Sequence, residues 1–260
     1  MNDRRPDLRD VQDFWDRRPC NIRHSPLEPG TRAYFEQVAE RRYFVEPHVR
    51  DFADFAAWSG RRVLEIGCGI GTDGVQFARA GANYTGVDVS EVSLDLARRA
   101  FAAFGLPATL IRANAETIDE VLPAGAFDLV YAFGVIHHTP SPRDVVAAVR
   151  RVIRQHGVFK LMVYARESWK SFMIEAGLDQ PEAQAACPIA LTYARAEIPA
   201  LLAGFHVEAL EQDHIFPFVL DKYLRYEYEV LPWIRAMPPE MFAVMRKRLG
   251  WHLLVTARPG

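Results

Sequence analysis

Cysteine is scarce in this 260-residue sequence, and charge of neither sign dominates. The three cysteines, Cys20, Cys68 and Cys187, stand at scattered positions. An odd number at such spacing excludes a disulfide framework and offers no metal-binding pair. The 31 basic and 33 acidic residues give a formal net charge of -2. Because no basic tract stands out, neither nucleic acid nor an anionic membrane surface is expected as a partner.

Long hydrophobic runs, internal repeats and low-complexity segments are also missing. No apolar stretch approaches the roughly 20 residues of a membrane helix, and the charged N-terminal segment lacks the apolar core of a secretory signal. Half of the residues are hydrophobic, which is typical of a globular protein with a sizeable core. We therefore expect a protein of the reducing cytoplasm, built on an α/β domain of ordinary size.

Residues 61–164 alternate between segments typical of strands and segments typical of helices. The strand segments are 62–67, 84–89, 108–112, 127–133 and 157–164, and the helical segments are 72–80, 90–104 and 142–154. Two further strand patterns follow at 205–210 and 251–257. Strands separated by helices predict a parallel sheet with right-handed crossovers. The sequence therefore favours an α/β, doubly wound, mostly parallel sheet of seven strands.

The flanking regions differ from this alternating part. Residues 1–60 have no strand signal, and their main helical pattern, over 32–58, is broken at Pro47. Their aromatic side chains fit either plain packing or a cap over a ligand cleft. Residues 211–250 form an aromatic-rich insertion before the last strand, too long for a hairpin loop. We expect an N-terminal helical cap and a domain over 61–260 whose insertion covers the acceptor site.

The most informative segment is a glycine-rich turn, VLEIGCGIGT at 63–72. A buried strand ends there and a helix begins, so the turn brings a ligand close to the main chain and to the helix N-terminus. Residues 69–74 also match the G-x-G-x-x-G dinucleotide fingerprint. That alternative has less weight, because the strand closes at Gly67 and the third fingerprint glycine would then fall on Thr72.

Asp88 strengthens the ligand-binding interpretation. It ends the second strand about 20 residues beyond the turn, where a carboxylate can accept hydrogen bonds from both hydroxyls of a ribose. The alternative is an aspartate that caps the following helix. Spacing and strand context together favour the ribose role.

Four segments together resemble the class I S-adenosylmethionine-dependent methyltransferases. They are VLEIGCGIG (63–71), GVDVS (86–90), NAE (114–116) and FDLVYAFGVIHHTP (127–140), in the right order and spacing. The resemblance implies a Rossmann-like fold, S-adenosylmethionine as cofactor, and transfer of its methyl group to an acceptor. Methyl transfer is an in-line displacement that requires no metal, and the sequence suggests none.

The resemblance also assigns the contacts of the cofactor. Glu65 would support the turn and reach the methionine end, and Asp88 would hold the ribose. The side chain of Asn114, where the family often has aspartate, and the backbone N–H of Ala115 would meet the adenine. The implied cofactor residues are Glu65, Gly67, Cys68, Gly69, Gly71, Asp88, Val89, Asn114, Ala115, Glu116, Phe133 and Gly134.

Candidate acceptor residues follow the fourth and fifth strands and lie in the flanking regions. His137 or His138 could take a proton from an oxygen or nitrogen nucleophile near neutral pH, or could hydrogen-bond the loop instead. Arg166 and Lys170 could hold an anionic group of the acceptor. The candidates, for each of which plain packing or solvent exposure is the alternative, are Trp15, Tyr34, Tyr164, Arg166, Lys170, Tyr193, His214, Tyr223 and Tyr226.

The favoured function is therefore methyl transfer to an oxygen, nitrogen or carbon atom of a small molecule. Family members that methylate nucleobases or glutamine amides carry a polar-Pro-Pro-aromatic motif after the fourth strand, whereas this chain has Ala132, Phe133 and Gly134. The alternatives are a protein or nucleic-acid methyltransferase, and a non-methylating protein that binds S-adenosylmethionine or a dinucleotide. The sequence leaves the oligomeric state open.

Overall fold

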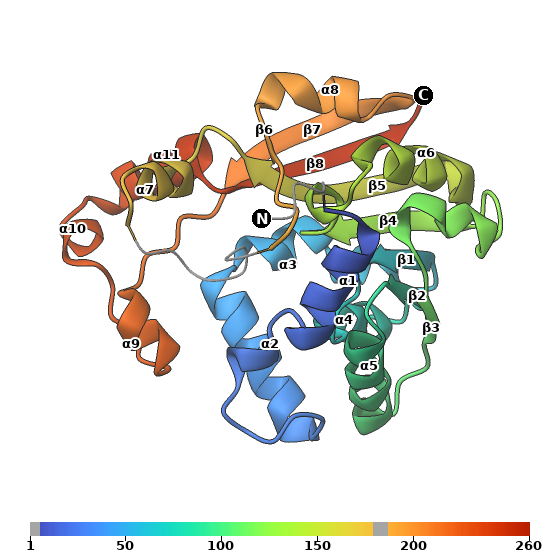
Figure 1. Ribbon diagram of the computed structural model, residues 1–260, viewed down its shortest axis with the longest axis horizontal. Helices are drawn as coiled ribbons and strands as arrows, with labels where there is room; N and C mark the ends of the chain where they lie inside the picture. The colour runs from blue at the N-terminus through green and yellow to red at the C-terminus, as the bar shows by residue number, and fades with distance from the viewer. Residues whose placement is uncertain (1–5, 179–186) are drawn as a thin grey trace.

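A seven-stranded sheet forms the centre of the structure, a computed structural model that describes residues 6–178 and 187–260 (Figure 1). Its strands are β1 (Arg62–Ile66), β2 (Asn83–Asp88), β3 (Thr109–Arg112), β4 (Phe127–Phe133), β5 (Ile153–Ala165), β7 (Phe205–Asp213) and β8 (His252–Pro259). They lie in the order β3-β2-β1-β4-β5-β8-β7. The first five are parallel, and β8 is antiparallel to both of its neighbours. This confirms the predicted Rossmann-like, doubly wound sheet.

A short additional strand, β6 (Thr192–Tyr193), pairs with the end of β5. The sequence analysis did not predict it. Two residues are too few to show the alternation of apolar and polar side chains by which strands are recognised.

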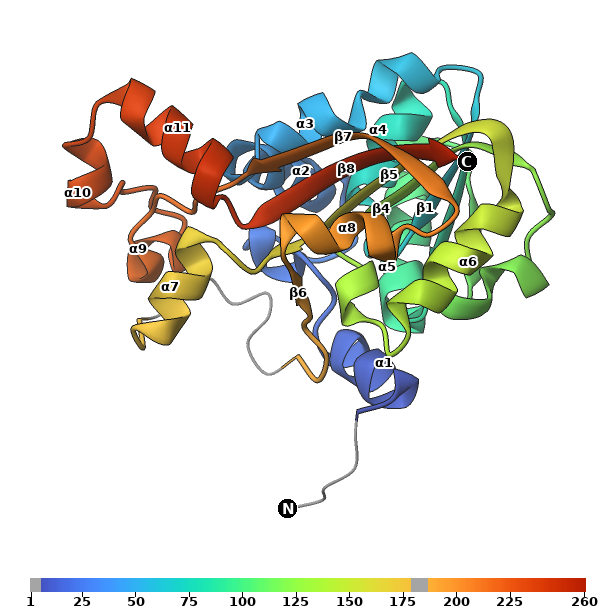
Figure 2. The same cartoon turned by 90° about the horizontal axis from the view of Figure 1, so that it is seen from above.

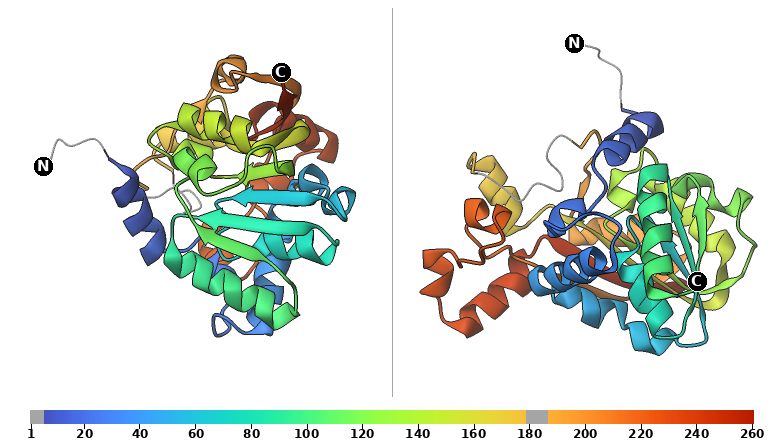
Figure 3. Two further views of the ribbon diagram at one scale, coloured as in Figure 1. Left: turned by 90° about the vertical axis from the view of Figure 1, so that its right-hand side faces the viewer. Right: turned by 90° about the horizontal axis from the view of Figure 1, so that it is seen from below.

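Strand β1 shows why the central strands are predictable. Leu64 and Ile66 pack in the same apolar cluster as α6 (Pro142–Val152). Val63 packs in a second cluster with α4 (Thr72–Arg79) and α5 (Glu91–Phe104). Figure 3 shows α5 and α6 on opposite sides of the sheet. A strand covered on both faces is mostly apolar, and in β1 only the buried Glu65 interrupts the apolar run.

The N-terminal region carries helices, as its sequence pattern indicates. They are α1 (Leu8–Arg17), α2 (Arg32–Val45) and α3 (His48–Ala53), with 3-10 turns at Ile22–His24 and Phe55–Trp58. Pro47 stands between α2 and α3, where a break was expected. Ser90 caps α5: its hydroxyl accepts a hydrogen bond from the N–H of Ser93 at 3.1 Å.

The helix predicted over 142–154 is shorter than expected, since α6 ends at Val152 and β5 begins at the next residue. Residues 195–201 form a 3-10 turn at Arg195–Glu197 followed by α8 (Ile198–Leu201). A further 3-10 segment, Ala115–Glu120, follows β3. Within residues 6–178 and 187–260, no helix has both the length and the apolar character that a membrane crossing requires.

Residues 211–250 contain three short helices. Strand β7 continues to Asp213, and α9 (Leu220–Leu224), α10 (Pro232–Arg235) and α11 (Pro239–Leu249) follow it. Figure 2 shows these helices gathered at one end of the molecule beside α7 (Trp169–Glu175). The sequence analysis did not predict α7.

A buried ion pair fastens α2 to the helix that follows the glycine turn. The guanidinium of Arg42 donates from Nε to Asp73 Oδ1 at 3.1 Å and from Nη2 to Asp73 Oδ2 at 3.0 Å. The hydroxyls of Tyr43 and Tyr131 donate to the same carboxylate at 2.8 and 3.3 Å. Both charged residues are buried, and this bidentate, hydrogen-bonded pairing compensates for their loss of water. Helix α2 therefore cannot shift without leaving a charge buried and unpaired.

Asp73→Asn should lower the free energy of unfolding by about 3 kcal/mol, because it leaves the buried Arg42 charge short of its main partner. Urea denaturation followed by circular dichroism measures this loss. Glu36→Gln is the matched control, since Glu36 pairs with Arg32 at 3.0 Å on the exposed surface, where a pair contributes about 0–1 kcal/mol. Equally small losses in both variants would contradict the role given to the buried pair.

Candidate active site

Two adjoining cavities lie at the carboxyl ends of the parallel strands. The larger has a volume of about 470 Å³ and the smaller a volume of about 120 Å³. Their shared wall consists of Trp15, Cys20, Phe133, Gly134 and His138. It lies at the end of β4, the neighbour of β1, where the strand order reverses. Ligands of open α/β sheets bind at this switch point.

The ends of three strands supply one side of the smaller cavity. Gly67 and Gly69 follow β1, Asp88 ends β2, and Asn114 follows β3. Both glycines have positive φ, at 67° and 52°. A Cβ on Gly67 would lie 2.3 Å from Val135, whereas no described atom would lie within 4 Å of a Cβ on Gly69. Gly69 therefore presents open main chain to a ligand.

The Asp88 carboxylate joins the glycine turn to the end of β2. Its Oδ2 accepts a hydrogen bond from the N–H of Gly69 at 2.8 Å, and its Oδ1 accepts one from the N–H of Ser90 at 2.9 Å. Burial raises the pKa of Asp88, while these N–H donors act against the rise by stabilising the charged form. Each carboxylate oxygen can accept a second hydrogen bond. Asp88 can therefore receive two neighbouring hydroxyls.

Aromatic side chains from distant parts of the chain line the larger cavity. They come from α1, from the ends of β4 and β5, from α7, and from the segment between β7 and β8. They are Trp15, Phe133, Tyr164, Trp169, Phe216, Phe218, Tyr223, Trp233 and Trp251. A pocket walled by rings offers a large contact area to an apolar organic ligand.

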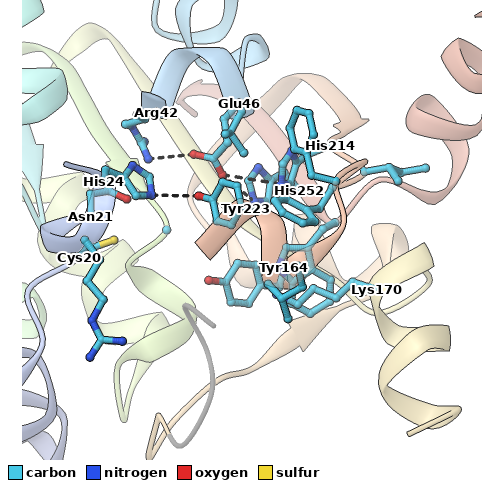
Figure 4. Close-up of a pocket in the computed structure, with 18 of the residues that line it drawn as sticks. Cys20, Asn21, His24, Arg42, Glu46, Tyr164, Lys170, His214, Tyr223 and His252 are labelled. Atoms are coloured by element: carbon cyan, nitrogen blue, oxygen red, sulfur yellow. Dashed lines mark hydrogen bonds and ion pairs between the residues drawn. The ribbon is translucent and has the colours of Figure 1, made fainter. Parts of the chain in front are cut away.

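A polar group interrupts this aromatic wall (Figure 4). Glu46, directly after α2, accepts a hydrogen bond on Oε2 from Arg42 Nη1 at 2.9 Å. Its Oε1 lies 3.9 Å from Nε2 of His214 and 3.7 Å from Nε2 of His252. The Nδ1 of His252 lies 2.9 Å from Nε2 of His48. We refer to Glu46, His214 and His252 as the Glu–His cluster.

Burial keeps the histidines of this group uncharged at neutral pH. It lowers the pKa of His48 to about 4 and the pKa of His214 to about 3. It also holds the pKa of His252 well below the ordinary value. A neutral imidazole donates from one ring nitrogen and accepts on the other, so each ring offers one lone pair.

Comparison with known proteins identifies the domain around these cavities. Residues 64–159 match the family model of a methyltransferase domain. A ubiquinone biosynthesis O-methyltransferase of Pseudomonas aeruginosa is 30% identical over 148 residues, which make up 53% of this chain and 61% of that protein. The chain carries a methyltransferase domain over residues 64–159. S-adenosylmethionine is the methyl donor expected for such a domain.

Solved structures share the fold over more of the chain than the family model does. The magnesium protoporphyrin IX methyltransferase of Synechocystis PCC 6803 gives a TM-score of 0.62 at 18% identity, covering 98% of this chain and 100% of that chain. The cyclase SpnF gives a TM-score of 0.62 at 17% identity, covering 98% of this chain and 97% of that chain. Such likenesses show a shared fold, which does not fix the reaction. The chain spans between 43% and 61% of the length of the curated relatives it matches.

The residues around the smaller cavity fit S-adenosylmethionine. Asp88 can receive the ribose hydroxyls, and the open main chain at Gly69 lets the cofactor approach closely. Asn114 uses its side-chain oxygen to accept the N–H of Glu116 at 3.1 Å. The implied cofactor residues that line this cavity are Gly67, Gly69, Asp88, Val89, Asn114, Ala115, Phe133 and Gly134. Their individual contacts with the cofactor stay predictions.

Four implied cofactor residues lie outside both cavities, and their roles toward the cofactor stay predictions. They are Glu65, Cys68, Gly71 and Glu116. The Glu65 carboxylate accepts a hydrogen bond from the hydroxyl of Tyr84 at 2.5 Å, and the Glu116 carboxylate accepts one from the N–H of Ser141 at 2.7 Å. Cys68 is buried, and Gly71 caps α4. These residues lie outside the cavities and stabilise the segments that line them.

Five predicted acceptor residues line the larger cavity: Trp15, Tyr164, Lys170, His214 and Tyr223. The structure corrects the prediction for Tyr34 and Arg166. Tyr34 is fully buried in the core, and its hydroxyl donates to the carbonyl of Ile22 at 2.9 Å. Arg166 lies on the surface and pairs with Glu197 at 2.8 Å.

Tyr193 and Tyr226 also lie outside the larger cavity. Tyr193 belongs to β6 and packs against the main apolar cluster. The hydroxyl of Tyr226 donates to the carbonyl of Arg23 at 3.0 Å. Both tyrosines stabilise the protein around the cavity instead of touching what it holds.

The two candidate bases differ in position. His137 is fully buried against Tyr164, with ring centroids 3.7 Å apart, and lies outside both cavities. This position makes His137 the weaker of the two candidate bases. His138 lies on the shared wall, where its Nδ1 is 2.6 Å from the carbonyl oxygen of Ile189 and donates to it, leaving Nε2 as the acceptor. Burial lowers the pKa of His138 to about 4. A base role for His138 stays a prediction.

The sequence analysis missed four polar residues of the larger cavity and its support: Arg42, Glu46, His48 and His252. Arg42 belongs to α2 and Glu46 follows it directly. His48 begins α3 and His252 begins β8. No local spacing links positions so far apart along the chain. The one available signal was the concentration of histidines next to predicted strand ends.

Asp88→Ala should weaken S-adenosylmethionine binding about tenfold or more, because two hydrogen bonds to the ribose are lost. Isothermal titration calorimetry measures the dissociation constant. Asp95→Ala is the matched control, because Asp95 lies on the exposed side of α5. Thermal melting shows that each variant is folded. An unchanged dissociation constant in folded Asp88→Ala would refute the ribose assignment.

Proposed function

We propose that this methyltransferase transfers the methyl group of S-adenosylmethionine to an oxygen, nitrogen or carbon atom of a small organic acceptor. The wall shared by the two cavities carries the proposal. A cofactor whose ribose lies at Asp88 would place its sulfonium near Phe133 and Gly134, which border both cavities. An acceptor in the larger cavity would then face the methyl group.

The shape of the larger cavity supports a small acceptor. Its volume of about 470 Å³ lies within the roughly 300–1,000 Å³ of small-molecule sites. We propose that residues 1–60 and 211–250 cover it, since Trp15 of α1 and Phe216 and Tyr223 of the insertion line its wall. The relatives named as ubiquinone biosynthesis O-methyltransferases support a small-molecule acceptor.

The chain's contribution to the reaction is orientation and the exclusion of water. Bound S-adenosylmethionine supplies an electrophilic methyl group on a sulfonium. The aromatic wall would hold the acceptor in line with it, and orientation of this kind can supply about 7–11 kcal/mol. His138 borders the same space. Lys170 lies with its ammonium 5.0 Å from the Trp251 ring centroid and could bind an anionic group of the acceptor.

Transfer of a tritiated methyl group from S-adenosylmethionine tests the proposal. The protein is incubated with a panel of hydroxylated and aminated aromatic compounds, and the label is sought in the small-molecule, protein and nucleic-acid fractions. Label in a small molecule supports the proposal. Label confined to protein or nucleic acid, or no transfer by a protein that binds the cofactor, would overturn it.

Leu220→Trp should reduce kcat/KM for the best acceptor of this panel at least tenfold, because the larger ring occupies space in the cavity that Leu220 lines. The dissociation constant for S-adenosylmethionine should stay within about twofold. Leu224→Trp, at an exposed position at the other end of α9, is the matched control and should retain full transfer. Equal activity of both variants would mean that the acceptor binds elsewhere.

A further inference from the structure

We propose that the Glu–His cluster binds a divalent transition-metal cation, with Zn²⁺ as the best match, at the wall of the larger cavity. The three ligand atoms are Oε1 of Glu46 and Nε2 of His214 and of His252, and they lie within 4.8 Å of one another. The separations of 3.7 and 3.9 Å from the carboxylate oxygen are too long for hydrogen bonds. The rings of His214 and His252 are stacked, with centroids 4.6 Å apart and an interplanar angle of 23°, so one ring must rotate for both lone pairs to reach one cation.

The donor set matches that of a reactive zinc site. Two histidines, one glutamate and an open fourth position are the arrangement of catalytic zinc. Ligand distances of about 2.0–2.2 Å in a tetrahedron place the ligand atoms about 3.4 Å apart, so the cluster would contract by roughly 1 Å on binding. Glu46 lies just past the end of α2, and His214 just past the end of β7. Both positions permit such an adjustment.

Outer partners hold the ligands in orientation. Arg42 donates to Oε2 of Glu46 and so directs Oε1 toward the histidines. His48 holds Nδ1 of His252 at 2.9 Å. When His252 donates its Nδ1 proton to His48, its Nε2 lone pair remains for the cation. Second partners of this kind fix the tautomer and the ring orientation of metal-ligating histidines.

The charges around the cluster leave the negative charge of Glu46 available to bind a cation. Arg42 carries a positive charge next to Glu46, but its bidentate pairing with Asp73 balances that charge. The negative charge of Glu46 then remains for the metal. Lys170, which lines the same cavity, opposes binding. Arg246 also acts on His214, but it pairs with Asp213 at 3.3 Å. The sequence analysis suggested no metal, because the three ligands are scattered from α2 to β8 and share no motif.

The role of the cation rests on the proposed function. The cation would bind a hydroxyl of the acceptor and lower the pKa of that hydroxyl, and the proton would pass to solvent water. The acceptor oxygen then forms its bond to the methyl carbon while the carbon–sulfur bond breaks, and S-adenosylhomocysteine leaves as a neutral thioether. The cluster therefore points to a hydroxylated acceptor, and a phenol or catechol suits the aromatic wall best.

Metal binding is tested without reference to turnover. The full-length protein is freed of metal with a chelator and titrated with Co²⁺, whose visible absorption reports coordination, and with Zn²⁺ in calorimetry. We expect one equivalent of each ion to bind. His214→Asn and His252→Gln should each weaken binding at least tenfold. His214 has φ of 78°, a conformation that asparagine tolerates, so this variant keeps its backbone. His206→Asn, at an exposed position on β7, is the matched control.

Two results would overturn the metal site: wild-type protein that binds no Co²⁺ or Zn²⁺, and His214→Asn and His252→Gln proteins that bind as tightly as wild type. Binding of S-adenosylmethionine by the same samples shows that the variants are folded. Full methyl transfer by the chelated enzyme without metal binding would end the metal inference and leave the proposed function standing. Metal binding without methyl transfer to any small molecule would support the metal site and overturn the proposed function.

Discussion

The parallel pairing of β1 with both β2 and β4 decides where the side chains proposed to bind the cofactor can lie. It brings the glycine turn after β1, Asp88 at the end of β2 and Phe133 at the end of β4 to one edge of the sheet. The hydrogen bond from Gly69 to Asp88 then ties the turn to the neighbouring strand. A cofactor cavity follows from this edge alone, because the main chain is open there and a carboxylate lies beside it.

The acceptor side is built differently, from segments that the sheet only supports. Helix α2 is held by the buried pair of Arg42 with Asp73, which stands in the first turn after the glycine loop. The same arginine directs Glu46 toward His214 and His252. One guanidinium therefore connects the cofactor loop, the N-terminal helices and the polar part of the larger cavity. Aromatic residues from the insertion complete the wall.

The parts that could be predicted from sequence are those encoded over short distances. The glycine turn, Asp88 and the alternating strands each occupy a local pattern with a direct structural meaning. Tyr34 and Arg166 show the limit, because an aromatic on a helix and a charged residue after a strand look alike whether they face a cavity, the core or water. His137 and His138 are adjacent, yet only His138 borders the cavities. The Glu–His cluster could not be predicted from the sequence, because its three residues are far apart along the chain and only tertiary packing brings them together.

A crystal structure with S-adenosylhomocysteine bound tests the central claim most directly. The account predicts the ribose hydroxyls on the two oxygens of Asp88 and the sulfur beside Phe133, facing the space enclosed by the aromatic residues. A nucleoside bound away from Asp88, or a sulfur separated from the larger cavity by protein atoms, would contradict it.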